Sequence, residues 1–320
     1  MNSNSKYKLK IVDSKNIFGT MNSGTIRLTN ITPDDRKMIM LKNNLDFLDD
    51  YELTRSDKST IFLNHRQKFG EANGFDGQKM FMADQLYKDG SHFELTEDYV
   101  KANPNGWTDI PEDILVITDK VPGVVIGHPV ADCPVVIMEA KDKGITALAH
   151  CSAELIDKKM PMMIADCLTH DYGLGEDEIK VYVGACAGKD WAYDSLPKWA
   201  QNKKVWEGCI IEENGVFRID LKKALEKQFK YRKLNNVIYS NIDTIKDNNY
   251  YSNSEARINP NKFGRQFIGA FYTEEDKHKS FKKILTNQVF MHKILLVEKK
   301  GKRFISTWST SSDGLMPRIK

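Results

Sequence analysis

The stretches ADCPVVIM at residues 131–138 and GITALAH at residues 144–150 decide how this chain folds. Each is a short apolar run that is typical of a buried strand, and the short turn between them predicts a pair of neighbouring strands. We expect Cys133 and His150 to lie at facing strand ends, where a thiol and an imidazole can share a zinc ion. The alternative interpretation is a buried cysteine that acts as a small hydrophobe and a hydrogen-bonded core histidine.

Strands and helices alternate outward from this pair. Strands are predicted at 114–118, 124–127 and 237–240, and the clearest helix at 152–169. That helix carries one apolar stripe, formed by Leu155, Ile156, Met160, Met163, Ile164, Cys167 and Leu168. Cys167 on this stripe is predicted to be a structural core residue. The alternation predicts an α/β (α+β) fold, with a layered mixed sheet and flanking helices.

The rest of the chain divides into one large domain and an extension. We expect an α/β domain at 1–272 and, at 273–320, a helix and hairpin packed on it. The further predicted elements are a helix at 34–48, loops at 64–77 and 101–112, a helix at 276–285, and strands at 294–297 and 304–308.

Composition narrows the classes of partner. The 47 basic and 44 acidic residues leave a net charge of only +3, which does not favour nucleic-acid binding. No apolar run approaches the roughly 18 to 20 residues that span a bilayer, so we expect no membrane partner. Five cysteines without a Cys-x-x-Cys pair, behind a polar N-terminus, predict a reducing compartment, most simply the cytoplasm.

The order of motifs resembles a known family. GVVIG at 123–127, then Ala-Asp-Cys-Pro, then Ala-His and a helix are similar to the proteins called multicopper polyphenol oxidase, laccase-domain or purine nucleoside phosphorylase proteins. VGACAG at 183–188 and Gly264-Arg265 resemble later family segments. The resemblance extends from about Phe18 to Tyr272 and implies the family's fold.

The resemblance also implies a metal site. Cys133 and His150 would be two of its ligands, with Asp132 orienting a ligand or base, and these three are the expected catalytic residues. The family's third ligand is the histidine of a Gln-Val-His-Gly motif, and Tyr87 stands at that place here. The candidates to replace it are His92, which we expect, and His128 and His65. Three protein ligands would leave the fourth zinc position open for water, whereas two would bind metal poorly.

Several family residues are replaced in this chain. Cys151-Ser152-Ala153-Glu154 stands where the family has Ala-Gly-Trp-Arg, Thr20-Met21 replaces an early Thr-Arg, and Asn253 and Ser254 replace late arginines. Because arginine grips phosphate through two parallel hydrogen bonds, these losses weaken an anion site built on those guanidinium groups.

The resemblance implies four alternatives for function. The first is an enzyme with a small-molecule substrate, which catalyses zinc-dependent phosphorolysis of purine nucleosides or deamination of adenosine. The second is copper-dependent oxidation of polyphenols, and the third is hydrolysis of amide bonds in cell-wall peptide precursors. The fourth is a non-catalytic relative with a decayed metal site and no cofactor, acting as a binding or assembly protein.

Overall fold

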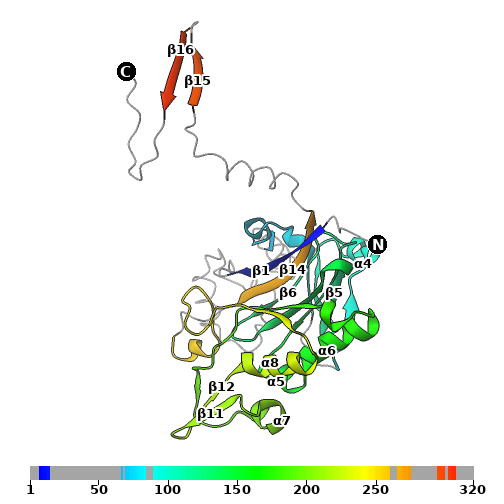
Figure 1. Cartoon of the computed structure of the whole chain (residues 1–320), viewed down its shortest axis with the longest axis vertical. Coiled ribbons are helices and arrows are strands. Elements are labelled where there is room, and N and C mark those ends of the chain that lie inside the picture. Colours follow the sequence, from blue (N-terminus) through cyan, green and yellow to red (C-terminus); the bar gives the residue numbers. More distant parts are fainter. Residues whose placement is uncertain are drawn as a thin grey trace, which may run out of the picture. The chain divides into compact units, whose positions relative to one another are not determined.

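The structure is a computed structural model of the chain, and it describes residues 7–14, 66–67, 69–83, 89–259, 265–274, 294–299 and 302–307. The chain divides into two compact units, Met1–Glu274 and Glu275–Lys320 (Figure 1). The predicted helices at 34–48 and 276–285 lie outside the described residues, as do His65 and Tyr87.

A six-stranded mixed sheet forms the middle of the first unit. In spatial order its strands are β13 (Asn236–Tyr239), β9 (Lys180–Val183), β7 (Val135–Ala140), β8 (Ile145–His150), β5 (Ile114–Thr118) and β3 (His92–Glu94). The predicted pair is confirmed as antiparallel β7 and β8, with Val135 opposite His150. Gly144, at a φ of 63°, closes the turn between them in a conformation that suits glycine.

A second sheet of five strands packs against the first. In spatial order it contains β1 (Tyr7–Ser14), β14 (Gln266–Glu274), β6 (Val125–Val130), β2 (Met80–Ala83) and β4 (Trp107–Ile110). A core of buried apolar side chains from both sheets lies between them, including Ile126, Ile137 and Leu148. The hydroxyls of Thr146 and Tyr272 also hydrogen-bond across this layer, 2.9 Å apart.

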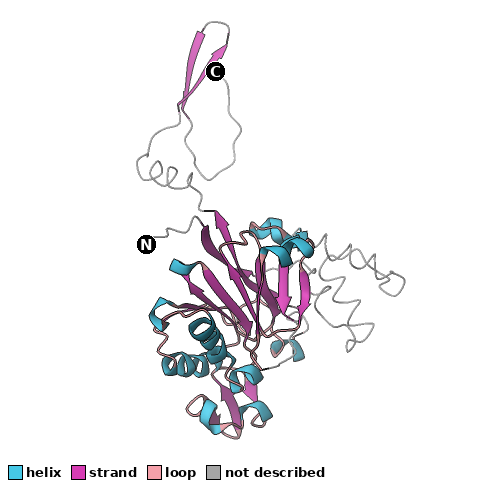
Figure 2. Cartoon of the chain, turned by 90° about the vertical axis from the view of Figure 1, so that its right-hand side faces the viewer, coloured by secondary structure: helices cyan, strands magenta, loops and turns pink. Residues whose placement is uncertain are grey.

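Helices cover the other face of the six-stranded sheet (Figure 2). They are α5 (Ala153–Asp157), α6 (Met160–Asp166), the π-helical turn η4 (Cys167–Asp171) and α8 (Leu221–Tyr231). Asp220 caps α8 by accepting a hydrogen bond from the Lys223 N–H. On the outer face of the five-stranded sheet, a cluster of aromatic rings includes Phe69, Phe75 and Phe267. The layered α/β fold with a mixed sheet is therefore confirmed.

Smaller elements complete the described structure. They are η2 (Gly77–Lys79), α4 (Glu97–Ala102), η3 (Lys141–Lys143), η5 (Glu176–Glu178), η6 (Lys198–Ala200), α7 (Lys203–Trp206), η7 (Glu255–Arg257), and a small sheet of β10 (Ala192–Tyr193), β12 (Val216–Ile219) and β11 (Ile210–Glu213). In the second unit, β15 (Ile294–Lys299) and β16 (Lys302–Thr307) form the predicted antiparallel hairpin. Within the described ranges, no helix has the length and apolar character needed to cross a membrane.

Three local predictions are wrong. The helix predicted at 152–169 is interrupted at Lys159, whose φ of 66° lies in the left-handed region, and α6 starts afresh with Pro161 in its first turn. Residues 69–73, predicted as loop, are helical, because burial of the Phe69 ring outweighs the local glycines. The predicted loop at 101–112 contains β4, which pairs with β2.

Candidate functional site

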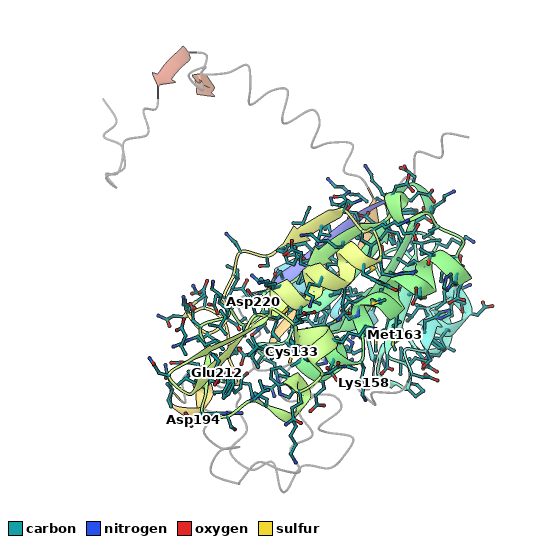
Figure 3. The ribbon with its side chains drawn as sticks, turned by 60° about the horizontal axis from the view of Figure 1, so that its bottom comes forward. Cys133, Lys158, Met163, Asp194, Glu212 and Asp220 are labelled. Carbon is teal, nitrogen blue, oxygen red and sulfur yellow. The ribbon has the colours of Figure 1, made fainter. Side chains whose placement is uncertain are left out.

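Cys133 and His150 reach the same layer of the molecule. Cys133 lies in the turn before β7, and His150 is the last residue of β8. The Cys151 N–H donates to the Pro134 carbonyl at 2.8 Å, which extends the pairing to the Cys133 turn. Alternation along β8 points His150 to the same side as Leu148, into the core between the sheets, and Cys133 packs against that core too. Figure 3 labels Cys133 within the body of the first unit.

His128 joins them from the other sheet. It lies opposite Ile268 in the pairing of β6 with β14, and on β6 it shares a face with Ile126 and Val130, which point into the layer between the sheets. The rings of His128 and His150 are 5.8 Å apart between centroids, and the two residues are only 1% and 7% exposed. None of their four ring nitrogens has a hydrogen-bond partner among the described residues. Buried imidazoles are normally partnered, so this pair is an exception that a bound ion or ordered water would explain.

Burial keeps both imidazoles neutral. Desolvation, with repulsion from His150, lowers the pKa of His128 to about 3. Desolvation, with repulsion from Arg265, lowers the pKa of His150 to about 4. A neutral imidazole presents a free lone pair, which is the form that binds metal ions.

The Cys133 thiol is also neutral when no metal ion is bound. Burial, followed by the negative charge of Asp132, raises its pKa to about 12, while Arg265 and a hydrogen bond from the Ala153 N–H act in the opposite direction. A divalent cation reverses this balance, because a coordinating thiol is deprotonated outright.

Arg265 is a further functional candidate, which the sequence motifs alone do not single out. It interacts electrostatically with His150, Cys133 and Asp132. Burial lowers the pKa of its guanidinium, and the charges of Cys133 and Asp132 oppose that shift. Gly264-Arg265 resembles a family segment, so this arginine is retained although the other family arginines are replaced. A guanidinium at this position can bind an anion.

Asp132 fastens the loops around the site. Its Oδ1 accepts a hydrogen bond from the Thr244 hydroxyl at 2.8 Å, and its Oδ2 accepts one from the Ser254 N–H at 2.6 Å. Its carbonyl accepts a further bond from the Ala187 N–H at 2.8 Å. Because both carboxylate oxygens are engaged, Asp132 is suited to holding the site in shape rather than to abstracting a proton.

His92 is not brought to Cys133 and His150. It lies opposite Ile114, whose side chain faces the helices, so it points to the other face of the six-stranded sheet. Its Nδ1 is 3.5 Å from Asp171 Oδ2. This geometry corrects the expected third ligand, because the residue beside His150 is His128. The sequence could not separate them, since it does not show which face of a three-residue edge strand turns inward.

One group of three candidate ligand atoms lies within 4.8 Å of one another among the described residues, and it comprises His92, Cys167 and Asp171. Cys133, His128 and His150 are therefore not gathered as tightly in this structure. Their convergence on one ion stays a prediction.

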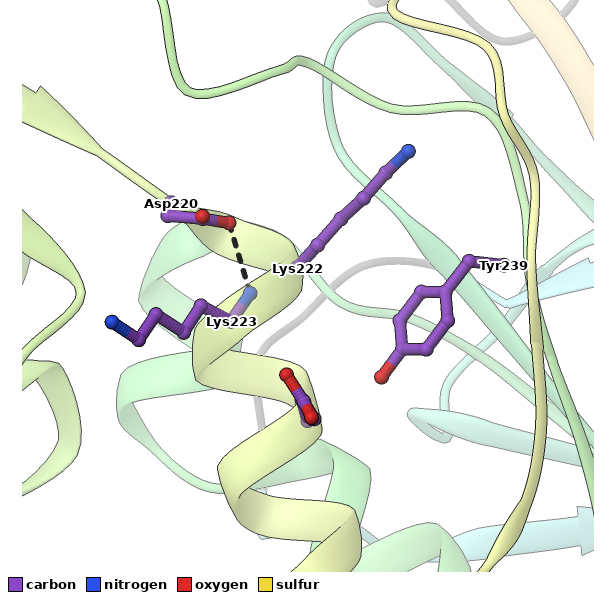
Figure 4. Close-up of a pocket in the computed structure, with 5 residues that line it drawn as sticks. Asp220, Lys222, Lys223 and Tyr239 are labelled. Carbon is purple, nitrogen blue, oxygen red and sulfur yellow. Dashed lines mark hydrogen bonds between the residues drawn. The ribbon is translucent and has the colours of Figure 1, made fainter.

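An open pocket of about 330 Å³ lies elsewhere, at the start of α8 (Figure 4). Its lining residues are Asp220, Lys222, Lys223, Glu226 and Tyr239. Asp220 is used as the helix cap, and the Lys222 ammonium donates to the Ser240 carbonyl at 2.8 Å. Mixed charges that are already engaged locally make this pocket a poor candidate for catalysis.

Comparison with known proteins decides the family. Residues 48–271 match the family model described as multi-copper polyphenol oxidoreductase laccase. The chain belongs to this laccase-like family. The resemblance found in the sequence is thereby confirmed, and no curated protein matches the chain.

Solved structures share the laccase-like fold. The hypothetical protein YfiH of Bacillus licheniformis is 16% identical with a TM-score of 0.53, over 68% of this chain and 84% of that one. YlmD of Geobacillus stearothermophilus is 17% identical with a TM-score of 0.56, over 68% and 83%. NMB0706 of Neisseria meningitidis is 13% identical with a TM-score of 0.50, over 66% and 81%. At such identities the likeness concerns the fold alone.

The donor set of this laccase-like protein suits a metal ion. Two neutral imidazoles with unpartnered nitrogens and a nearby thiol are the nitrogen and sulfur donors that zinc prefers. Copper also binds imidazole and thiolate ligands, so donor chemistry alone does not choose between the two metals.

Proposed function

We propose that this laccase-like protein is a metal-dependent enzyme that acts on purine nucleosides, by phosphorolysis of the glycosidic bond or by deamination of adenosine. The observation that carries the proposal is the buried pair of His128 and His150, whose ring nitrogens have no partner among the described residues. Leaving such groups unsatisfied costs about 1 to 3 kcal/mol each, which a bound ligand would recover.

His128, His150 and Cys133 would hold the metal ion, with His128 in the role first expected for His92. Three protein ligands leave one position open, as in catalytic zinc sites. Zinc in such a site supplies a Lewis acid that polarises the substrate and activates water.

The neighbouring residues bind and position the substrate. Arg265, beside Cys133 and Asp132, offers a cation for phosphate in phosphorolysis, and its planar fork suits two parallel hydrogen bonds. Asp132 holds the loops of Ala187, Thr244 and Ser254 in place and so fixes the walls around Cys133. The retained Arg265 is the reason to place phosphorolysis beside deamination, despite the arginines missing elsewhere.

The first test is metal content by elemental analysis, comparing the purified chain with the Cys133→Ala/His150→Ala double variant. We expect the unaltered chain to hold about one equivalent of zinc more than the double variant, because the variant lacks two of the three ligands of this site. Stoichiometric copper would replace this proposal with phenol oxidation. Absence of any metal in the unaltered chain would overturn it in favour of a non-catalytic relative.

The second test is turnover of adenosine and inosine, with and without phosphate. Phosphate-dependent release of free base from inosine would show phosphorolysis, and release of ammonia from adenosine would show deamination. His128→Gln should lower both metal content and turnover, whereas His170→Gln, at an exposed position in η4, should change neither. Equal metal content in the His128→Gln protein would exclude His128 as a ligand.

Arg265→Lys separates the two reactions. It keeps the charge and removes the planar fork, so we expect a KM for phosphate raised about tenfold or more, with a smaller effect on deamination. An unchanged KM for phosphate would remove Arg265 from the phosphate site.

A further inference from the structure

A second cluster of metal-ligating side chains lies on the helix side of the six-stranded sheet. His92 projects from β3, and Cys167 and Asp171 come from the first and last residues of η4. One candidate ligand atom from each lies within 4.8 Å of the other two. Cys167 packs in the core on the helix side of the sheet, whereas Cys133 packs against the core between the two sheets. The cluster is therefore distinct from the site between the sheets.

The local structure explains why these three side chains meet. Residues four apart on a helical turn share a face, so Cys167 and Asp171 point together towards β3. The π-helical form of η4 is a rare, wide turn that occurs frequently at functional sites. A second side-chain pair runs beside the cluster, because the Tyr172 hydroxyl donates to Glu94 Oε2 at 2.8 Å. The edge strand β3 is thus joined to η4 at two places.

We propose that His92, Cys167 and Asp171 bind a zinc ion that fastens β3 to η4. Imidazole nitrogen, thiolate sulfur and carboxylate oxygen are all established zinc donors. Ligand atoms around a tetrahedral zinc ion lie roughly 3.3 to 3.6 Å apart, as follows from bond lengths of about 2.0 to 2.3 Å. His92 Nδ1 and Asp171 Oδ2 are already 3.5 Å apart, and no pair in the cluster has to close by more than about 1.5 Å.

One side of the cluster of His92, Cys167 and Asp171 is exposed to solvent, so a metal ion can enter from that side. The side chains of His92 and Asp171 are 32% and 52% exposed, while Cys167 lies at the buried end of the cluster at 3%. The fourth coordination position therefore opens to solvent. One thiolate and one carboxylate together balance the charge of a divalent cation, which limits the cost of holding it partly inside the protein.

The experiment is a titration of the metal-free full chain with Zn²⁺ and with Co²⁺, in the Cys133→Ala background that removes the thiol of the other site. We expect one equivalent to bind, with a cobalt–thiolate charge-transfer band in the near ultraviolet. Adding His92→Gln or Asp171→Asn should weaken Zn²⁺ binding at least about tenfold. His170→Gln, beside the cluster, should leave it unchanged. Both test substitutions are at partly exposed positions, and circular dichroism checks that the fold survives.

The outcomes also separate this inference from the proposed function. If only the site between the sheets binds metal, Cys133→Ala abolishes binding and His92→Gln does not, which overturns the second site. If only the second site binds metal, His92→Gln abolishes binding and Cys133→Ala does not, which overturns the proposed function alone. A third outcome is that the Cys133→Ala protein binds zinc equally well with and without His92→Gln or Asp171→Asn. These side chains then form no more than an ion pair, which would also overturn the second site.

Discussion

Asp132 has an unfavourable backbone conformation and a carboxylate that forms stabilising hydrogen bonds. Its φ of 73° is unfavourable for a residue with a Cβ, yet its carboxylate holds two loops. We expect Asp132→Ala to lower the free energy of unfolding by about 2 to 4 kcal/mol, because it loses both hydrogen bonds and keeps the backbone strain. Asp132→Gly should cost about 1 kcal/mol less, because glycine adopts positive φ freely. Urea denaturation measures both, and equal losses would show that the backbone carries no strain.

The imidazole pair makes stability depend on pH. In the metal-free protein the pKa values of His128 and His150 fall from 6.5 to about 3 and about 4, so the unfolded chain binds more protons between these limits. Stability is therefore fully present above about pH 6.5 and is lost as pH falls towards the folded-state values, by up to about 1.4 kcal/mol per pH unit for each histidine. Urea denaturation at about pH 7 and about pH 5, with a chelator present, measures the loss.

His128→Leu tests the cause of this pH dependence. Leucine fills a similar space without a titrating group, so we expect the loss of stability between about pH 7 and about pH 5 to be roughly halved. His170→Gln serves as the control, with the pH dependence of the unaltered chain. A His128→Leu protein as sensitive to acid as the unaltered chain would show that His128 is not the buried neutral group described here.

At the scale of elements, Lys159 interrupts a helix that the apolar stripe predicts as continuous. Its φ of 66° and exposed side chain make it a position where glycine fits better than lysine. We expect Lys159→Gly to raise the free energy of unfolding by about 0.5 to 1 kcal/mol, measured by urea denaturation. The matched control is Lys158→Gly, where φ is −77° and glycine should destabilise instead. A gain in both variants would contradict the conformational explanation.

The sequence predicts some secondary-structure elements correctly and misses others. Apolar runs identify β5, β7 and β8 because their side chains are buried on both faces. Periodicity does not detect the break at Lys159, since α5 and α6 bury the same stripe on either side of it. It also misses β4, whose four residues gain their strand conformation from pairing with β2.

The candidate site was likewise predictable only where its residues belong to local motifs. Cys133 and His150 could be identified because they lie at the ends of strands that are neighbours in sequence. His128 lies opposite Ile268, on a strand of the second sheet, and only the packing of the two sheets brings it to His150. Arg265 reaches the site from the start of β14, more than a hundred residues along the chain from Cys133. Such contacts between distant segments are not contained in local patterns.

At the scale of the whole molecule, β14 closes the first unit. It lies between β1 and β6 in the five-stranded sheet and ends at Glu274, two residues beyond the domain boundary expected from the sequence. The family match ends at residue 271, inside this strand. Both candidate metal sites therefore lie in the part of the chain that ends with β14, and β14 is an interior strand of the five-stranded sheet.

A chain that ends after Glu274 should fold and keep the metal content of the full chain. All of β14 is retained, including Phe271, whose ring lies 5.4 Å from that of Phe75, and Tyr272, whose hydroxyl is 2.9 Å from that of Thr146. A chain that ends after Gly269 lacks both aromatic residues and should not fold. Losing one such buried side chain costs about 3 to 5 kcal/mol, whereas the whole free energy of unfolding of a typical domain is about 5 to 15 kcal/mol. Thermal denaturation and elemental analysis of both chains test this. Failure of the longer one would show that residues 275–320 support the domain, as expected of an extension packed on it.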